Sequence, residues 1–499
     1  MKDKRLTCIG VFFCLCFALV ALYLGSICIF KNESYSKSAA LQRRETLDIK
    51  VHRGKFYDRN MIPLVESVAT RMKLDENGVL NTEKGQELPY ITSRYSKDGI
   101  AEHIIGYVDG EGKGICGMEK CFDKAVSRYE YTSVNIIKSA DGKIINGFGM
   151  GFEPGKDATD GVKLTLDSHI QKICEEELSS NSLTGAVVVM DVDSFDVLAM
   201  ASMPDYDQTS IEKYVKGDGS ELVNRCISSY NAGSIFKIIT MSSALETGRV
   251  RSEYICEGKT DITGTTFGCH KKEGHGILTL GDAFAKSCNC TFYSVGLDVG
   301  AEKLLSVAKD YGVGTSLLGY SDLEEAMGNI PQKPIYTAVD YANYAIGQGE
   351  VLITPLQAAN MVCIVASDGI SKEVNIADGI YSSDGTMKRP LRRVGKRRVI
   401  RRETAGIIQD SMCKTVESGT GKSLASSPAK IAGKTGTAET GWIEGGKMLE
   451  HGWFCGYFPF DNPQYAMAVL IENGGSGAVS AAPVFKNIAE KIIKIYPMG

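Results

Sequence analysis

An uncharged apolar run near the N-terminus is the feature that most constrains this chain. Residues 7–30, TCIGVFFCLCFALVALYLGSICIF, are 24 consecutive residues without a charged side chain. As a helix rising about 1.5 Å per residue they reach roughly 36 Å, which is enough to cross a bilayer. Lys2, Lys4 and Arg5 precede the run, and such a basic flank favours the cytoplasmic side. The sequence predicts a cytoplasmic tail over residues 1–6 and a transmembrane anchor over residues 7–30.

A cleaved signal peptide is the alternative for this segment. The apolar core of a signal peptide has about 7–15 residues and ends in a small-residue cleavage site. This run is longer, and no A-x-A-like site follows it. We therefore expect an uncleaved, single-pass anchor in the plasma membrane, with the rest of the chain after Phe30 outside the cytoplasm.

Composition predicts that the rest of the chain is folded and is not built to bind nucleic acid. Hydrophobic residues make up 43% and charged residues 23% of the 499 residues, which is ordinary for a globular protein. The 56 basic and 60 acidic residues leave a net charge of -4, which gives no bulk attraction to a polyanion. At roughly 100–200 residues per domain, two to four domains fit.

The pattern of apolar residues changes near residue 160. Residues 31–160 mix short apolar runs with many glycines, whereas a strongly periodic pattern starts at Val162. We expect a small N-terminal module over residues 31–160 and a larger domain over residues 161–499.

The larger domain shows five β-rich runs between two helical segments. The predicted strands are 185–192, 196–203, 431–438, 452–459 and 465–472, and the predicted helices are 167–178 and 482–496. Only three residues separate the first two strands, which indicates a hairpin. This order predicts an α+β domain, in which helices flank a five-stranded antiparallel sheet.

Three short segments carry side chains suited to acyl transfer. Ser234 and Lys237 are one helical turn apart, and a desolvated lysine can be neutral enough to activate a serine hydroxyl. Ser287 and Asn289 alternate, so both can face one cleft. The run Lys434-Thr435-Gly436-Thr437 offers a cation and hydroxyls to a carboxylate, and its glycine lets another backbone lie close. Singly, these segments also fit a helix cap, a polar turn and an ordinary strand.

In this order the three segments resemble the S-x-x-K, S-x-N and K-T-G signature of penicillin-interacting serine enzymes. Further stretches narrow the resemblance to class B penicillin-binding proteins, the monofunctional peptidoglycan transpeptidases. These stretches are 53–60 (RGKFYDRN), Glu325-x-x-Gly328-x-x-Pro331, 347–349 (GQG), 354–357 (TPLQ) and 451–454 (HGWF). Phe56 and Met61 depart from the first of these family elements. The resemblance covers roughly residues 50–499.

The resemblance implies a role for each motif residue. Ser234 would be acylated, Lys237 would be its base, and Ser287 would relay the proton to the departing amine. The backbone N–H groups of Ser234 and Thr437 would form the oxyanion hole. The implied catalytic residues are Ser234, Lys237 and Ser287, and the implied residues binding the substrate peptide and its carboxylate are Asn289, Lys434, Thr435, Gly436 and Thr437.

The implied activity is D,D-transpeptidation of peptidoglycan stem peptides, with no cofactor and no metal, blocked covalently by β-lactams. The module over residues 31–160 would be a non-catalytic, dimerisation or pedestal-like domain, because it is too short for a glycosyltransferase. A membrane glycan polymerase would then be the partner. A penicillin sensor or an idle scaffold for wall synthesis is the alternative from another class, although the six residues before the anchor supply no output domain.

A β-lactamase or D,D-carboxypeptidase is the alternative within enzymes, since the same motifs serve an acyl-enzyme that water resolves. Glu325 and Asn329 have the four-residue spacing of a water-activating pair. Their context fits the transpeptidase-like E-x-x-G-x-x-P instead, so we expect slow deacylation.

Two polar segments invite other interpretations. Gly419-Thr420-Gly421-Lys422-Ser423 suggests a phosphate loop, but Val416 stands where that motif needs glycine. Residues 388–402 carry nine basic side chains. A solvated surface is the simpler interpretation, and contact with an anionic wall polymer or membrane surface is the functional one.

The cysteines leave a further question open. Of 15 cysteines, four lie in the anchor, so the 11 outside it cannot all pair with one another. Cys256, Cys269, His270 and His275 are candidate zinc ligands, with Cys288 and Cys290 nearby in the sequence. The long gap between Cys256 and Cys269 fits a zinc finger poorly, and we expect a disulfide or free thiols there.

Overall fold

The computed structural model of the chain forms two compact units. It describes residues 2–65, 68–75, 80–81, 86–96, 99–110, 112–127, 130–139, 141, 143–144, 151–153, 160–217, 219–382 and 384–497. The first unit comprises Met1–His52, Val68–Ser93 and Tyr129–Asp157, and the second comprises Arg53–Ser67, Arg94–Arg128 and Ala158–Gly499. Residues 53–67 and 94–128 thus belong with the C-terminal part, whereas the expected boundary near residue 160 placed them in the N-terminal module.

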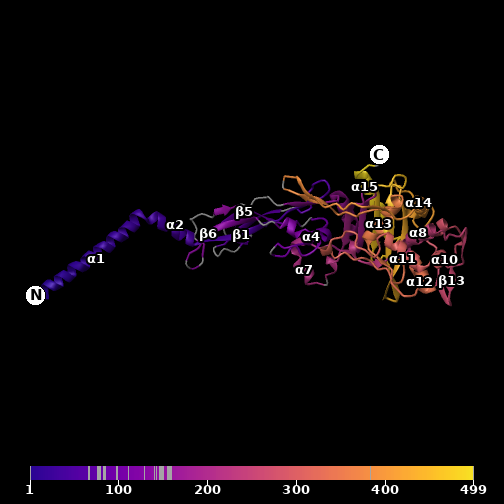
Figure 1. Cartoon of the computed structure of the whole chain (residues 1–499), viewed down its shortest axis with the longest axis horizontal. Helices are drawn as coiled ribbons and strands as arrows, with labels where there is room; N and C mark the ends of the chain where they lie inside the picture. The colour runs from indigo at the N-terminus through magenta and orange to yellow at the C-terminus, as the bar shows by residue number, and fades with distance from the viewer. Residues whose placement is uncertain are drawn as a thin grey trace. The chain divides into compact units, whose positions relative to one another are not determined.

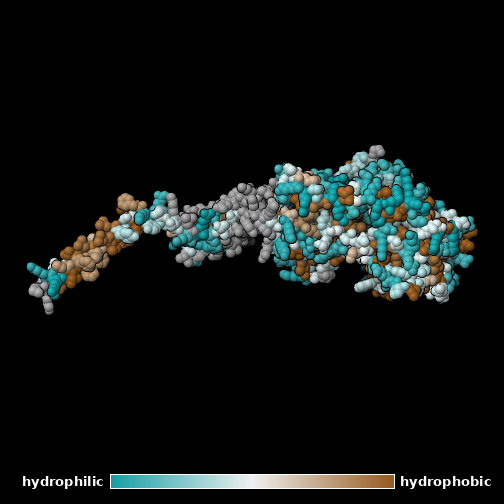
Figure 2. Space-filling model, in the orientation of Figure 1, coloured by the Kyte–Doolittle hydropathy of each residue, from teal (hydrophilic) through white to brown (hydrophobic). Residues whose placement is uncertain are grey.

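The first unit begins with the long helix α1 (Lys2–Phe30), which includes the whole uncharged run. Its side chains over residues 7–30 are largely exposed and uncharged, as Figure 2 shows for the brown helix at the start of the chain. Helix α1 is long and apolar enough to cross a membrane. The rest of the unit consists of α2 (Asn32–Gln42), an antiparallel sheet of β1 (Arg44–His52), β6 (Glu130–Ile137) and β7 (Gly151–Glu153), and a second one of β3 (Val68–Leu74), β4 (Leu80–Asn81) and β5 (Gln86–Ser93).

A buried ion-pair cluster joins residues 53–67 to residues 94–128. The Arg53 Nε donates to the Glu119 carboxylate at 2.7 Å, and Arg94 pairs with the same carboxylate from the other side. Glu119 is fully buried, so loss of either arginine would leave a poorly compensated charge. Asp58 accepts a hydrogen bond from the Ser168 hydroxyl at 2.9 Å. The contact of Asp58 with Ser168 joins the Arg-Gly-x-x-x-Asp-Arg-Asn segment to the C-terminal part of the unit.

Short elements surround this cluster. They are β2 (Phe56–Tyr57), α3 (Glu102–Ile105), α4 (Gly117–Cys121), α5 (Asp123–Val126) and β8 (Gly161–Leu164), and β2 and β8 form a four-stranded sheet with β18 (Ala377–Tyr381) and β19 (Met387–Pro390).

The central sheet of the second unit has five antiparallel strands in the order β10-β9-β23-β22-β21. The strands are β9 (Gly185–Asp191), β10 (Val197–Met203), β21 (Ala432–Glu444), β22 (Lys447–Phe458) and β23 (Tyr465–Ile471). All five predicted strands and the antiparallel arrangement are confirmed.

Helices cover both faces of this sheet, as the side-chain alternation along β9 dictates. Val187 and Val189 pack in a cluster with α6 (Ser168–Ser180) and α15 (Ala481–Ile495). Val188 and Met190 point the other way, into the core that contains α13 (Pro355–Ala366). Figure 1 shows α15 and α13 beside the yellow strands.

A helical region lies between β10 and β21 in the sequence. Its elements are α7 (Glu212–Val215), β11 (Tyr230–Asn231), the 3-10 turn η4 (Gly233–Phe236), α8 (Lys237–Thr247), α9 (Leu280–Ala285), α10 (Asn289–Val299), α11 (Ala301–Asp310), α12 (Ala338–Ala345), β16 (Leu352–Ile353), α13, β17 (Ile370–Lys372), β20 (Lys396–Arg398) and α14 (Arg402–Glu417). Two small ribbons, β12 (Tyr254–Cys256) with β15 (Gly276–Leu278) and β13 (Lys259–Ile262) with β14 (Thr265–Gly268), stand between α8 and α9.

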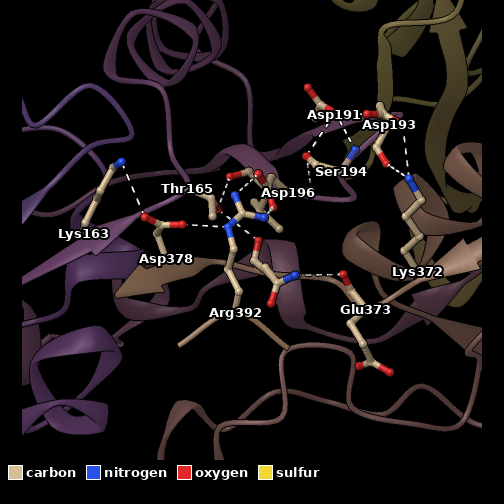
Figure 3. Close-up of polar contacts among 12 residues, drawn as sticks. Lys163, Thr165, Asp191, Asp193, Ser194, Asp196, Lys372, Glu373, Asp378 and Arg392 are labelled. Atoms are coloured by element: carbon tan, nitrogen blue, oxygen red, sulfur yellow. Dashed lines mark hydrogen bonds and ion pairs between the residues drawn. The ribbon is translucent and has the colours of Figure 1, made fainter. Parts of the chain in front are cut away.

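Basic side chains of segment 388–402 form ion pairs with acidic residues of the same domain. Arg392 makes two hydrogen bonds to Asp196, at 2.9 and 2.5 Å, and a third to Asp378 at 2.7 Å. Figure 3 shows the Arg392 guanidinium between these carboxylates, with Lys163 on the far side of Asp378. Further pairs are Lys388 with Asp160, Arg393 with Glu373, Arg397 with Asp310, Arg401 with Glu246 and Arg402 with Asp368. The segment is partly exposed, but its charge is largely matched by its own fold.

Candidate active site

Ser234 lies on a tight turn pressed between two other elements. It belongs to η4, directly before α8. The preceding Gly233 has a φ of 54°, and a Cβ there would lie 2.4 Å from the carbonyl oxygen of Thr437 on β21. The Gly233 N–H donates to the Gly347 carbonyl at 2.8 Å. Only glycine fits at position 233, and this close fit sets Ser234 against the edge strand.

Gly436 allows the same approach from the strand side. A Cβ at Gly436 would lie 2.9 Å from Ile235 Cγ2 and 3.0 Å from the Trp453 Cβ. A side chain would therefore push β21 away from the turn that carries Ser234. The absence of a side chain at Gly436 thus lets β21 pack closely against the turn that carries Ser234.

Lys237 is fully buried, and its amine binds Ser287 and Asn289. Its Nζ donates to the Asn289 Oδ1 at 2.7 Å, to the Ser287 carbonyl at 2.9 Å and to the Ser287 Oγ at 3.2 Å. Among the described residues, it has no hydrogen bond to Ser234. Burial lowers the pKa of Lys237 to about 7, because a charged amine is poorly solvated there.

Lys434 reaches the same serine hydroxyl from β21. Its Nζ donates to the Ser287 Oγ at 2.9 Å and to the Thr435 carbonyl at 2.8 Å. Burial, and then the neighbouring charge of Lys237, lower the pKa of Lys434. The Ser287 hydroxyl therefore accepts from two amines, and its own proton stays free to be donated.

These residues surround one cleft of about 870 Å³. Six of the eight predicted site residues line it, namely Ser234, Ser287, Asn289, Thr435, Gly436 and Thr437. Lys237 and Lys434 lie beneath its floor, both fully buried. The structure thus brings all eight predicted residues together.

The sequence interpretation missed Thr420 in this cleft. Its hydroxyl lies 2.5 Å from the Thr435 hydroxyl, and it lines the cleft. Thr420 is the centre of the Gly-Thr-Gly turn that invited the phosphate-loop interpretation. That turn was the available signal, but only the fold shows that it lies beside the Lys-Thr-Gly-Thr strand.

The Glu325 carboxylate binds groups of the loop at residues 316–318, and Glu325 does not line the cleft. Its carboxylate accepts from the Leu317 N–H at 2.7 Å, the Leu318 N–H at 3.0 Å and the Ser316 hydroxyl at 2.5 Å. The Asn329 amide donates to the Glu350 carbonyl at 2.5 Å. The four-residue spacing of Glu325 and Asn329 therefore serves loop structure.

The cysteine expectation is resolved in favour of free thiols. Cys256 and Cys269 are both unpaired, so the disulfide is wrong. Both sulfurs lie beside the ring of His275, at 3.5 and 3.6 Å from its Nδ1.

The fold and the cleft together define a serine acyltransferase. A serine on a tight turn has a buried lysine behind it, and burial lowers the pKa of that lysine to about 7. A second serine hydroxyl joins that lysine to another amine, and a strand with a hydroxyl-rich edge closes the cleft.

Comparison with known proteins narrows this class to one family. Residues 185–490, more than half of the chain, match the model of the penicillin binding protein transpeptidase domain. The chain belongs to this family of serine acyltransferases, and within it to the class B penicillin-binding proteins.

Individual relatives extend the similarity beyond the domain. The chain is 27% identical to stage V sporulation protein D of Bacillus subtilis, over 97% of this chain and 84% of the relative. It is 29% identical to the peptidoglycan D,D-transpeptidase PbpA of Mycolicibacterium smegmatis, over 71% and 78% respectively. A solved D,D-transpeptidase domain from Eggerthella lenta, at 26% identity, superposes with a TM-score of 0.69 over 89% of this chain and 99% of that one.

Proposed function

We propose that this chain is a peptidoglycan D,D-transpeptidase that works through an acyl-enzyme at Ser234. The observation that carries the proposal is the Ser287 hydroxyl, held between the Lys237 and Lys434 amines beside Ser234 in one cleft. Such a chain of groups can move a proton from a nucleophile to a leaving amine. The family and the names of the relatives support the same activity.

In the first step Ser234 Oγ attacks the carbonyl carbon of the terminal D-Ala-D-Ala bond. Neutral Lys237 accepts the serine proton, and Ser287 passes a proton to the nitrogen of the departing D-alanine. An ester bond to Ser234 forms as the peptide bond breaks. The backbone N–H groups of Ser234 and Thr437 stabilise the oxyanion.

The substrate carboxylate binds at the β21 side of the cleft. A bound carboxylate would raise the pKa of the buried Lys434 amine, so that Lys434 is protonated in the complex. Its positive charge then pairs with the substrate carboxylate. The hydroxyls of Thr435 and Thr437 supply hydrogen bonds, and Thr420 fixes the rotamer of Thr435. Asn289, whose Oδ1 is bound by Lys237, is left with its amide N–H groups for the peptide backbone.

In the second step the amine of a neighbouring stem peptide attacks the ester and regenerates Ser234. A β-lactamase must position and activate a water against the ester, usually with a carboxylate. Glu325 is occupied by three donors away from the cleft, which favours aminolysis. β-Lactams, which carry a carboxylate beside a reactive amide, are then covalent inhibitors.

The chain is a membrane protein on the strength of α1 and its family. We propose that residues 7–30 cross the plasma membrane once and that residues 1–6 stay inside, so that the cleft faces the cell wall. Residues 31–160 are too few for a glycosyltransferase domain, and we propose that a membrane glycan polymerase provides the glycan strands and that the first unit acts as a pedestal.

Labelling with a fluorescent penicillin, followed by mass spectrometry of the adduct, tests the site. Incubation of the full-length chain with polymerised lipid-linked glycan then tests the reaction. An adduct at Ser234 together with cross-linked stem dimers is expected. An adduct without dimers, in the presence of an acceptor amine, would instead indicate a sensor or scaffold. Labelling at another residue would contradict the assignment of the nucleophile.

A further inference from the structure

We propose that the chain binds a structural zinc ion beside the catalytic cleft, through three thiolates and one imidazole. The ligands are Cys256, Cys269, His275 and Cys288. The metal site itself does not depend on the reaction proposed above, whereas its effect on acylation rests on that proposal.

The four ligand atoms already stand at the spacing of a zinc tetrahedron. They all lie within 4.8 Å of one another. Zinc binds sulfur at about 2.3 Å and imidazole nitrogen at about 2.0–2.1 Å, so a tetrahedral S···N edge is about 3.6 Å long. The His275 Nδ1 lies 3.5 Å from the Cys256 Sγ and 3.6 Å from the Cys269 Sγ. Two edges therefore match within about 0.1 Å.

The backbone around these ligands is folded to bring them together. Gly258 has a φ of 88°, and a Cβ there would lie 1.9 Å from the Lys272 carbonyl oxygen. Gly274 has a φ of 79°, and its Cβ would lie 2.2 Å from the Cys256 carbonyl oxygen. Two glycines thus permit a pinched loop that side chains would open. The loop is closed further by the His275 N–H, which donates to the Cys256 carbonyl at 3.0 Å.

Two ribbons hold or flank three of the ligands, and the one formed by β13 and β14 has little else to stabilise it, whereas Tyr254 and Leu278 pack β12 and β15 into the main core. Strands β12 with β15 and β13 with β14 are two-stranded and three or four residues long. Such isolated hairpins are marginally stable in water. The cluster that contains Ile262 buries only two further residues, Tyr293 and Ala342. A metal ion would supply the missing stabilisation, as it does in other small ribbons.

The fourth ligand connects the metal site to the catalytic residues. Cys288 stands between Ser287 and Asn289, which both bind Lys237. Ser287 has a φ of 53°, a conformation that costs energy for a residue with a Cβ. A metal bond to Cys288 would hold this strained segment in place. Its sulfur also accepts a hydrogen bond from the Thr291 hydroxyl at 3.4 Å, the kind of contact that orients a metal ligand.

The ribbon also forms one wall of the cleft. Gly268 and Cys269 line it, and the Tyr293 hydroxyl of α10 donates to the Gly268 carbonyl at 3.1 Å. The zinc ion would therefore act as a positioning element for both the wall and the Ser287 segment, without touching the substrate.

Zinc fits this ligand set better than magnesium or calcium, which prefer oxygen. Binding involves no redox change. Each of the three thiols loses its proton to solvent as its sulfur binds the ion, and His275 binds as the neutral ring through Nδ1. The three cysteines are buried and His275 is half-buried, and cysteine and histidine in a tetrahedral set are the usual ligands of a closed, structural zinc site.

Metal analysis of the full-length chain, purified without a histidine tag from zinc-supplemented cells, tests the site directly. We expect one zinc ion per chain. Cys288→Ser and His275→Ala should lose it, whereas the matched controls Cys413→Ser and His270→Ala should keep it. Cys413 lies on α14, and His270 is outside the tetrahedral set. Retention of zinc in Cys288→Ser would overturn the ligand assignment.

Experiments on the unmodified chain keep the proposal falsifiable if the variants do not fold. Exchange of zinc for cobalt should give the visible absorption of a tetrahedral site together with thiolate charge-transfer bands. Metal-free wild-type protein, or a disulfide that joins Cys256 to Cys269 after anaerobic purification, would overturn the site.

A chelator titration tests the positioning role separately. Removal of the metal should slow acylation by penicillin at least about tenfold, and added zinc should restore it. Unchanged acylation by the metal-free chain would overturn the positioning role. Zinc binding without any penicillin adduct would contradict the proposed function and leave the metal site standing.

Discussion

The pH dependence of acylation follows from the burial of Lys237. The amine is fully buried and has its pKa lowered to about 7. Only the neutral amine can accept the proton of Ser234. We therefore expect the acylation rate to rise as pH increases through about 7 and then to level off, because the base is already deprotonated.

The magnitude can be worked from that value. With a pKa of about 7, roughly 9% of Lys237 is neutral at pH 6 and roughly 91% at pH 8, so the rate should rise about tenfold. Between pH 8 and pH 9 it should rise by only about a tenth. With an unshifted lysine pKa near 10.5, the acylation rate would instead rise about a hundredfold between pH 6 and pH 8 and about a further tenfold between pH 8 and pH 9.

Stopped-flow acylation by a fluorescent penicillin between pH 6 and pH 9 measures this profile. The second-order rate constant at low penicillin concentration should be used, because it reports the pKa values of the free enzyme, to which the value of about 7 for Lys237 belongs. Lys237→Met should acylate at least about 100-fold more slowly. The matched control is Lys303→Ala, an exposed lysine on α11, which should behave as the unmodified chain.

The same pKa shift predicts the sign of a stability change. The unfolded chain holds a proton on Lys237 up to about pH 10.5, whereas the folded chain releases it near pH 7. Folded stability should therefore rise across this window by about 1.4 kcal/mol per pH unit from this residue. Urea unfolding at several pH values should show a shallower rise in Lys237→Met.

Two results would refute this reasoning. A second-order rate constant that still climbs tenfold between pH 8 and pH 9 would show that burial does not lower the pKa of Lys237. A rate that is flat from pH 6 to pH 9, with unchanged acylation in Lys237→Met, would remove Lys237 from the reaction.

Three further predictions concern the nucleophile, deacylation and the basic segment. Ser234→Ala should abolish the penicillin adduct without a change in melting temperature, because the hydroxyl lies in an open cleft; residual labelling in that variant would place the nucleophile elsewhere. The adduct should last hours, which corresponds to a barrier of roughly 22–24 kcal/mol, and Glu325→Gln should destabilise the fold by about 1–2 kcal/mol without altering that lifetime. Turnover near one per second would favour a β-lactamase. Arg392→Met should cost about 2–3 kcal/mol in urea unfolding, because it strands the buried Asp196, whereas the exposed Arg389→Met should be nearly neutral; equal effects would show that the ion pairs contribute nothing.

Local patterns determined much of this protein. An uncharged run of 24 residues can bury its backbone in a bilayer only as a helix, and α1 is that helix. Strands β9 and β10 followed from apolar runs three residues apart in a predicted hairpin. Spacing also identified Ser234 with Lys237, and Ser287 with Asn289, because these pairs are neighbours along the chain.

Only tertiary structure decided which distant groups meet. Lys434 and Lys237 share the Ser287 hydroxyl although they are far apart in the sequence, and no local pattern encodes that contact. The basic segment looks like a free surface until Asp196 and Asp378 lie against Arg392. The sequence spacing of Cys256, Cys269 and His275 fits a zinc finger poorly. The fourth member of the proposed ligand set, Cys288, comes from the Ser-x-Asn segment and meets them only in the folded chain. Burial and long-range packing set these charges and contacts, and both depend on the whole chain being folded.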